Sequence, residues 1–206
     1  MPAKKNNAAK RSAPDGSATR LVATGLKHSR DQSYLCRPQL DVPDGYIRLS
    51  GDLERDSIVN GPGLRCVLWV QGCRQHCPGC QNPETWTEDP TVGATVSIEK
   101  VKEELRKLKG QSGITFCGGE PMLQSKALLE IARFCHQELG WNVWSFTGLI
   151  YEKIPRDGIE WEFIKELDAL IDGPFILFQR DLTMKFRGSR NQRILHLKNG
   201  EIESIE

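Results

Sequence analysis

The sequence lacks any apolar run approaching the ~18 residues that a membrane-spanning helix needs. Its polar beginning also lacks the apolar segment of a secretory signal, so neither a membrane anchor nor secretion is expected. A strong excess of one charge is missing too, because the formal net charge of the 206 residues is +1. Residues 1–30 hold seven of the 28 Lys and Arg but one of the 27 Asp and Glu, so the remainder is mildly acidic. That balance does not favour a nucleic-acid partner.

The sequence lacks an even set of cysteines, because their number, seven, is odd. A disulfide framework is therefore not expected, and the composition indicates a reducing compartment, the cytoplasm. Three of the seven form a cluster with the spacing Cys-x3-Cys-x2-Cys, at Cys73, Cys77 and Cys80. The cluster follows an apolar run at 66–70 that is typical of a buried strand.

Three thiolates in one short turn indicate a metal centre, because soft thiolates bind zinc and iron–sulfur clusters. A structural zinc site needs four ligands, and His76 is available as the fourth. A cubane iron–sulfur cluster held by three thiolates instead leaves one iron free for another ligand. That arrangement predicts a cluster that binds a small molecule and does chemistry on it.

Residues 1–45 are polar and basic without apolar periodicity, which predicts a disordered tail that contains Cys36. Residues 46–206 are expected to form one α/β domain, with residues 87–96 irregular. Strands are expected at 46–50, as an edge strand, and at 65–70, 113–117, 141–146, 168–172 and 192–197. Helices are expected from an N-cap at Ser97 to Gly110, at 124–139 and at 160–166. The alternation predicts a parallel sheet, with too few elements for an eight-stranded barrel.

Several polar or glycine-rich turns follow these strands. The pair Gly118-Gly119 would let a ligand approach the backbone closely, although the dipeptide alone is more typical of a plain strand-to-helix turn. Thr147 and Asp172 each end a strand, where parallel folds place their ligands. Asp172 could therefore bind a cation or simply form a turn. Cys117, beside the glycine pair, is most simply a small buried residue.

The order of these motifs resembles a known family. The segments are Val59-Asn60-Gly61-Pro62-Gly63-Leu64-Arg65-Cys66, Val70-Gln71-Gly72-Cys73, Cys77-Pro78-Gly79-Cys80, Asn82-Pro83-Glu84-Thr85-Trp86, Phe116-Cys117-Gly118-Gly119-Glu120-Pro121, Ile171-Asp172-Gly173-Pro174-Phe175 and Arg187-Gly188-Ser189-Arg190-Asn191-Gln192-Arg193. The cysteine spacing resembles the radical S-adenosylmethionine superfamily. The ordered set, from about residue 46 to about residue 198, resembles its members that activate anaerobic ribonucleotide reductase.

The resemblance implies a shortened, open, partial parallel β/α barrel. It implies that Cys73, Cys77 and Cys80 bind three irons of a [4Fe–4S] cluster and that S-adenosylmethionine chelates the fourth. Catalysis would then rest on the cluster and the cofactor, with no further catalytic residue. The residues that the resemblance assigns to cofactor binding are Gly79, Gln81, Gly118, Gly119, Glu120, Pro121 and Thr147. Many relatives also carry an aromatic residue beside the third cysteine, which this chain lacks.

The function that the resemblance implies is reductive cleavage of S-adenosylmethionine to create a glycyl radical on a reductase-like protein partner. A low-potential electron donor such as flavodoxin or ferredoxin would supply the electron. Two alternatives stay open. One is a different radical S-adenosylmethionine enzyme acting on a peptide, a nucleobase or a small molecule. The other is a non-enzymatic adaptor stapled by a metal ion.

Overall fold

The structure is a computed structural model that describes residues 38–206. The predicted disordered tail, with Cys36, lies outside the described residues as far as residue 37. Residues 38–45 end the stretch assigned to that tail, in which order was expected to begin near Tyr34, and the structure packs Leu40 on the body. Leu40 is buried, and its N–H donates to the carbonyl oxygen of Leu123 at 2.7 Å. This stretch therefore belongs with the body rather than with the tail.

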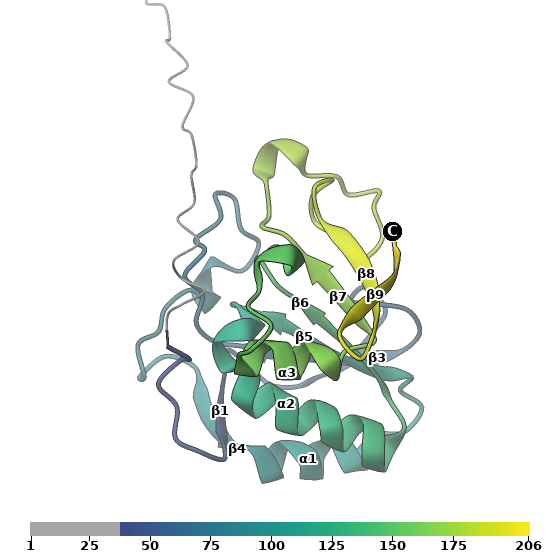
Figure 1. The fold of residues 1–206 in the computed structure, drawn as a ribbon. Coiled ribbons are helices and arrows are strands. Elements are labelled where there is room, and N and C mark those ends of the chain that lie inside the picture. The colour runs from purple at the N-terminus through teal and green to yellow at the C-terminus, as the bar shows by residue number, and fades with distance from the viewer. Residues whose placement is uncertain (1–37) are drawn as a thin grey trace, which may run out of the picture. The chain divides into compact units, whose positions relative to one another are not determined.

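The body is built on one mixed sheet of nine strands (Figure 1). The strand order is β4-β1-β3-β5-β6-β7-β8-β9, and β2 pairs with β3 off this path. The strands are β1 (Tyr46–Leu49), β2 (Glu54–Ser57), β3 (Arg65–Val70), β4 (Ala94–Ser97), β5 (Gly113–Gly118), β6 (Asn142–Phe146), β7 (Ala169–Asp172), β8 (Arg193–Lys198) and β9 (Glu201–Ile205). The central strands β3, β5, β6 and β7 are parallel, and every other pairing is antiparallel.

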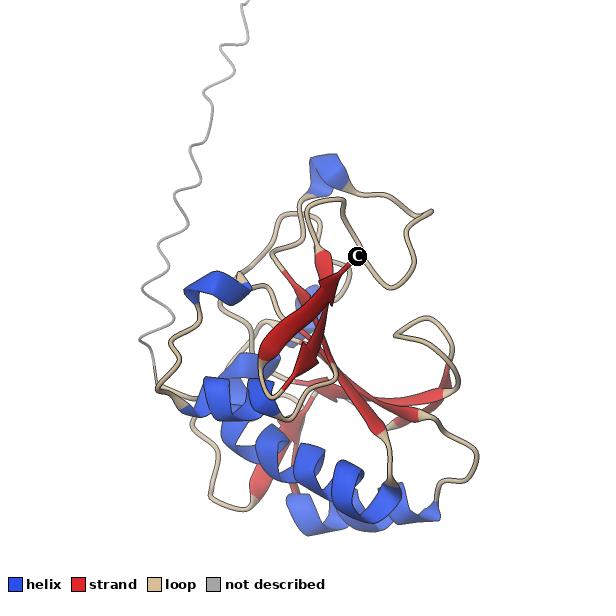
Figure 2. Cartoon of the chain, turned by 45° about the vertical axis from the view of Figure 1, so that its right-hand side comes forward, coloured by secondary structure: helices blue, strands red, loops and turns tan. Residues whose placement is uncertain are grey.

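The three α-helices of residues 38–206 lie side by side against one face of this sheet (Figures 1 and 2). They are α1 (Ile98–Lys107), α2 (Ser125–Phe134) and α3 (Ile159–Lys165). The predicted N-cap is confirmed, because the Ser97 hydroxyl accepts a 3.3 Å hydrogen bond from the N–H of Lys100. A π-helical turn, η4 (Cys135–Leu139), extends α2 and ends at Gly140, whose φ of 65° is left-handed. Short 3-10 turns are η2 (Pro83–Thr85), η3 (Pro121–Gln124), η5 (Tyr151–Lys153) and η6 (Leu177–Gln179).

Alternation along β3 sends its side chains to two different environments. Cys66, Leu68 and Val70 join the main core between the sheet and the helices. Arg65 and Trp69 point to the opposite, helix-free face of the sheet. A second, smaller core lies away from the main one and contains Trp144, Ala169, Ile171 and Ile194. The helix-free face is the one that the functional site uses.

Arg65 is buried on that helix-free face without a carboxylate partner among residues 38–206. Its Nε donates to the Thr115 hydroxyl at 2.8 Å, and its Nη2 donates to the carbonyl oxygen of Ile114 at 2.6 Å. The guanidinium also lies 5.3 Å from the centre of the Trp144 ring. Burial lowers the pKa of Arg65 from its ordinary value to about 10. Arg65 thus ties the starts of the parallel strands together.

The structure corrects the sequence-based strand assignments at both ends of the sheet. The strand at 46–50 is not an edge strand, because β1 lies between β4 and β3. Residues 94–97, mostly within the stretch expected to be irregular, form the true edge strand β4. The last predicted strand, β8, runs antiparallel to β7, and β2 and β9 were not predicted. The sequence of a short polar strand such as β2 shows no alternation of apolar and polar residues. Such a strand forms because it pairs with a neighbouring strand, so its own sequence does not predict it.

The coarse fold prediction is confirmed as a mixed α/β domain with a parallel centre. Within the described residues the sheet is open, since β4 and β9 end its strand order without pairing with each other. Among residues 38–206, no helix has the length and apolarity needed to cross a membrane.

Candidate functional site

The loop after β3 carries the three clustered cysteines and is fixed by backbone hydrogen bonds to the turn around η2. The N–H of Gly72 donates to the carbonyl oxygen of Thr85 at 2.8 Å, and the N–H of Cys73 donates to that of Trp86 at 3.0 Å. Within the loop, the N–H of Cys80 donates to the carbonyl oxygen of Cys77 at 3.0 Å. The sequence between the cysteines and Trp86 therefore folds back on itself and holds the thiols in place.

All three clustered cysteines line one large cavity of about 830 Å³. Cys73 and Cys77 are buried, whereas Cys80 is half-buried. Burial, with a smaller contribution from the nearby Glu120 carboxylate, raises the pKa of the Cys73 thiol to about 12. A bound metal would reverse this preference, since coordination stabilises the thiolate. Three thiols converging on an open cavity fit a cluster that leaves room for a further ligand.

His76 does not act as a fourth ligand in this arrangement. Its ring stacks on Trp86 with the centroids 4.8 Å apart and an interplanar angle of 28°. No group of three or more His, Cys, Asp or Glu side chains in the described part of the chain is arranged to hold a single metal ion. The thiols of a cubane cluster bind separate irons, so they need not meet at one point as zinc ligands do. The stacking of His76 on Trp86 does not support the zinc knuckle, which would need His76 as its fourth ligand.

Gly118 and Gly119 bring the end of β5 against the cysteine loop. The N–H of Gly119 donates to the carbonyl oxygen of Val70, and the N–H of Glu120 donates to that of Gly72, both at 2.8 Å. Gly118 has a φ of 106°, and a Cβ there would lie 2.6 Å from backbone atoms of Val70. A Cβ on Gly119 would clash with the carbonyl oxygen of Gly72. Both glycines line the cavity, but close packing on the cysteine loop is itself enough to require them.

Glu120 is the centre of the polar wall of the cavity. Its buried carboxylate accepts hydrogen bonds from the Thr147 hydroxyl and the N–H of Gly148, both at 2.8 Å, and from the N–H of Met122 at 3.1 Å. The side-chain amide of Gln75, in the cysteine loop, reaches the same carboxylate at 3.4 Å. Burial raises the pKa of Glu120, and the hydrogen bonds from Thr147 and Gly148 oppose that rise. Glu120 therefore joins the ends of β5 and β6 to the cysteine loop.

The structure gathers most of the predicted site residues around one cavity. The predicted residues on its lining are Cys73, Cys77, Cys80, Gln81, Gly118, Gly119, Glu120 and Thr147. Gly79 and Pro121 are not on the lining. A Cβ on Gly79 would meet the side chain of Leu177 at 2.8 Å, and Pro121 is buried at the start of η3.

The cavity also has lining residues to which the sequence analysis assigned no role. An aromatic residue is absent beside Cys80, but aromatic side chains reach the cavity from other elements: Trp69, Trp86, Phe146, Phe175 and Phe186. Glu54 on β2 lines it as well and accepts a 3.0 Å hydrogen bond from Nε1 of Trp69. These residues come from strands and loops far apart in the chain, and although Trp86 and Phe175 end two of the quoted motifs, their spacing did not show that they meet at one cavity.

Cys117 lines the cavity beside the three clustered cysteines. Burial raises the pKa of its thiol to about 12, so the thiol is protonated near neutral pH. The thiol is thus in the same state as that of an ordinary buried cysteine.

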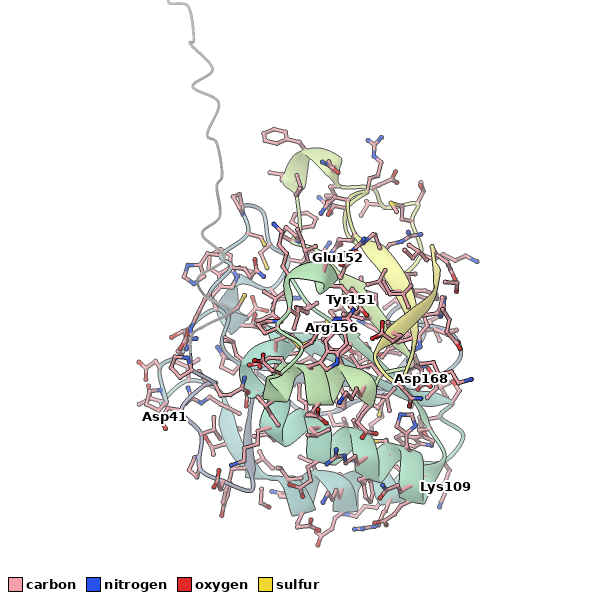
Figure 3. The ribbon with its side chains drawn as sticks, viewed as in Figure 1. Asp41, Lys109, Tyr151, Glu152, Arg156 and Asp168 are labelled. Atoms are coloured by element: carbon pink, nitrogen blue, oxygen red, sulfur yellow. The ribbon has the colours of Figure 1, made fainter. Side chains whose placement is uncertain are left out.

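Asp172 is already engaged by protein groups, which argues against the cation site considered from the sequence. Arg193 donates to Asp172 from Nε at 2.9 Å and from Nη2, and the N–H of Tyr151 donates to it at 3.0 Å. Arg193 also donates to both carboxylate oxygens of Glu152, which lies on η5 beside Tyr151 and Arg156 (Figure 3). Asp172 and Arg193 therefore hold together the two ends of the long loop between β7 and β8.

Comparison with known proteins agrees with this geometry. Residues 59–195 match the family model described as a 4Fe-4S single cluster domain. The fold and the thiol-lined cavity thus define an α/β protein with a single [4Fe–4S] cluster site.

Similarity to individual curated proteins identifies the family of this chain. It is 32% identical over 146 residues to the anaerobic ribonucleoside-triphosphate reductase-activating protein of Salmonella typhi, with 68% of this chain and 94% of that protein covered. The protein of the same name from Escherichia coli K12 is 33% identical over 147 residues, with 68% of this chain and 94% of that protein covered. The one from Enterobacteria phage T4 is also 33% identical over 147 residues, with 66% of this chain and 86% of that protein covered. The chain belongs to the family of anaerobic ribonucleoside-triphosphate reductase-activating proteins, which confirms the resemblance found in its motifs.

Among solved structures, the crystal structure of QueE from Escherichia coli aligns with 50% of this chain and 52% of its own, at 16% identity and a TM-score of 0.37. That similarity is too low to support an inference about function.

Proposed function

We propose that this chain is a radical S-adenosylmethionine activating enzyme that creates a glycyl radical on an anaerobic ribonucleoside-triphosphate reductase. The observation that carries the proposal is the convergence of three thiols and the Glu120-centred polar wall on one open cavity. Family membership supplies the reaction and the partner. In this proposal the open sheet forms a partial β/α barrel, and the cluster and the cofactor bind on its helix-free face.

The residues around the cavity divide into three roles. Cys73, Cys77 and Cys80 would bind three irons of the cluster. The residues that would face S-adenosylmethionine are Gln81, Gly118, Gly119 and Thr147. Glu120 would keep the turns that carry them in position through its hydrogen bonds. Once bound, the cluster and S-adenosylmethionine supply one-electron cleavage of a carbon–sulfur bond and the hydrogen abstraction that follows. The chain's own part is to bind, orient and exclude water, so no side chain needs to act as an acid or a base.

Gly79 and Pro121 have positioning roles in this proposal rather than direct contacts. Gly79 lets the cysteine loop pass under Leu177, and Pro121 starts the η3 turn that follows the Glu120 carboxylate. The aromatic side chains that reach the cavity from several elements would replace the aromatic residue that relatives carry beside the third cysteine. The electron would come from a low-potential donor such as flavodoxin or ferredoxin.

Electron paramagnetic resonance tests the proposal directly. The anaerobically reconstituted, reduced chain is mixed with S-adenosylmethionine and the anaerobic reductase encoded in the same genome. A glycyl-radical doublet on the reductase is expected, together with release of 5′-deoxyadenosine. Release of 5′-deoxyadenosine without a doublet would reject the reductase as substrate. A colourless protein that retains zinc and no iron would reject the enzyme altogether.

A further inference from the structure

A short segment before the first strand lies against the outside of the cofactor site. We call residues 38–42 the strap; Figure 1 shows it in purple at the left of the molecule, and Asp41 is labelled in Figure 3. The strap lies outside residues 59–195, which match the family model. None of its residues lines the large cavity. The strap therefore contacts the segments that form the site without facing any ligand inside it.

A hydrogen bond ties the strap to the cysteine loop. Arg74, the residue after the first clustered cysteine, donates from Nη1 to the carbonyl oxygen of Pro38 at 3.0 Å. Two further bonds fix the same guanidinium, because Arg74 donates to the two carboxylate oxygens of Glu88 at 2.6 and 2.7 Å. A bidentate pair of this kind holds the guanidinium in one orientation. Arg74 thus presents a fixed donor to the start of the strap.

The strap is also bonded to η3, the turn that follows the glycine pair and Glu120. The side-chain amide of Gln39 donates to the carbonyl oxygen of Met122 at 2.9 Å. The N–H of Leu40 donates to the carbonyl oxygen of Leu123 at 2.7 Å. From outside the cavity, the strap therefore connects the cysteine loop with the turn after β5, two segments that Glu120 joins within it.

Leu40 is the apolar anchor of the strap. Its side chain is buried, yet it belongs to neither of the two apolar cores. It packs on Gly72, because a Cβ on that glycine would lie 3.2 Å from Cδ2 of Leu40. The next residue is Cys73, which is 7% exposed. Leu40 therefore covers the backbone from which the first predicted cluster ligand extends.

Water beside a cluster changes how strongly the cluster holds an electron. The reduced cluster carries one more negative charge than the oxidised cluster, and water stabilises the more highly charged form. Excluding water from the ligand loop therefore lowers the reduction potential and makes the reduced cluster a stronger electron donor. Reductive cleavage of a sulfonium needs a strong donor, so a dry ligand loop favours the proposed reaction.

We propose that the strap holds Cys73 in position, keeps water from it and so maintains a low reduction potential of the cluster. Leu40 is a positioning residue, because it acts on the cluster through Gly72 and Cys73 rather than by contact with a ligand. The hydrogen bonds of Arg74 and Gln39 keep the strap closed over the cysteine loop. This inference rests on the proposed function, and it adds a determinant of the potential that lies outside the cavity.

A redox titration followed by electron paramagnetic resonance tests the strap in the full chain, reconstituted under anaerobic conditions without S-adenosylmethionine. Leu40→Ala is expected to shift the reduction potential of the cluster to a less negative value. In air it should lose the brown absorption of the cluster about tenfold faster than the wild type. Leu40→Met should restore the wild-type behaviour, because it conserves the volume of the side chain.

Val42→Ala is the matched control. Val42 belongs to the same strap, but it lines a second cavity, of about 270 Å³, which no residue of the cysteine loop lines. Its replacement should leave both the potential and the loss of absorption in air unchanged. If Leu40→Ala loses its cluster during isolation, Gln39→Ala is titrated in its place. That variant releases the strap from η3 with Leu40 intact, and a smaller shift in the same direction is expected.

Melting temperatures separate positioning from stability. A variant with a lower melting temperature and the wild-type potential would show that the strap only stabilises the fold, and the inference would be overturned. The two proposals fail in different ways. If the wild type takes up no iron and sulfide, or leaves no radical on the reductase, the proposed function is wrong. If it produces the radical and the strap variants keep its potential, the activase function stands and only the role of the strap is wrong.

Discussion

The Glu120 carboxylate and the Thr147 hydroxyl are joined by a 2.8 Å hydrogen bond between the ends of β5 and β6. Both residues line the cavity, and Glu120 has no cationic partner within the described part of the chain. Neutral donors alone therefore satisfy a buried carboxylate. The bond fixes the spacing between the glycine turn and the Thr147 turn, which face the proposed cofactor.

Replacing Glu120 with Ala is expected to destabilise the chain and to weaken cofactor binding together. The Thr147 hydroxyl and the N–H groups of Gly148 and Met122 would lose their acceptor in a buried site, at a cost of about 2–4 kcal/mol in the free energy of unfolding. Chemical denaturation measures the first effect, and calorimetric titration with S-adenosylmethionine measures the second. Glu138→Ala, which removes an exposed partner of Arg106, should change neither quantity by more than about 0.5 kcal/mol.

The raised pKa of Glu120 also predicts a pH dependence. A carboxyl whose pKa is higher in the folded state favours folding below its unfolded pKa, and this contribution is lost as the pH rises through the folded pKa. The stability of the wild type relative to Glu120→Gln should therefore be lower at about pH 7 than at about pH 4. Denaturation curves of the two proteins at both pH values provide the measurement. A difference that stays constant with pH would show that Glu120 titrates normally in the folded chain.

Single replacement of Cys73, Cys77 or Cys80 by Ala is expected to abolish stable binding of the cluster. Wild-type protein reconstituted under anaerobic conditions should contain about four irons per chain, with the brown absorption of a [4Fe–4S] cluster. Cys117→Ala is the matched control, because Cys117 lines the same cavity but lies outside the cysteine loop. Iron and sulfide analysis of the four variants decides the matter. Loss of iron in the Cys117 variant as large as in the other three would contradict the ligand assignment.

Gly119→Ala is expected to disturb the cluster site without touching a thiol. The added Cβ would collide with the carbonyl oxygen of Gly72, so the cysteine loop must move, at a cost of about 1–3 kcal/mol. Lower iron content after reconstitution and a lower melting temperature should appear together. Gly51→Ala provides the comparison, since a Cβ there has nothing within 4 Å. If Gly119→Ala binds iron normally but binds S-adenosylmethionine poorly, the glycine serves the ligand rather than the packing.

Local sequence was sufficient where a single segment determines its own geometry. The cysteine spacing, the cap at Ser97 and the glycine pair after β5 each describe one turn, and the structure brings the cysteines and the glycine pair to one cavity. The remaining features depend on pairing between distant segments. The edge strand β4 exists because it pairs with β1, although the sequence around it is polar. The aromatic residues of the cavity likewise come from separate elements: Trp86 and Phe175 end two of the quoted motifs, but their spacing does not show that they meet Phe146 at one cavity.

Arg65 provides the last prediction, because two opposing effects act on it. Burial lowers its pKa to about 10, which shows that the folded chain disfavours the charge. Against that cost, the guanidinium donates to Thr115, Asn142 and the carbonyl oxygen of Ile114 at distances of 2.6–3.2 Å. Replacement by Met would leave several buried acceptors without a donor. We therefore expect Arg65→Met to lower the free energy of unfolding by about 3 kcal/mol.

Arg65→Lys should recover only part of that loss, because an ammonium group offers three donors and lacks the planar geometry that reaches β5 and the start of β6 at once. Arg55→Met is the control, since Arg55 pairs with Glu104 at the surface. Urea denaturation of the wild type and the three variants shows whether desolvation of the guanidinium or its hydrogen bonds contribute more to the free energy of unfolding. Buried ion pairs can be replaced by apolar side chains at no cost when desolvation dominates. A Met variant as stable as the wild type would therefore mean that desolvation of the guanidinium outweighs its hydrogen bonds.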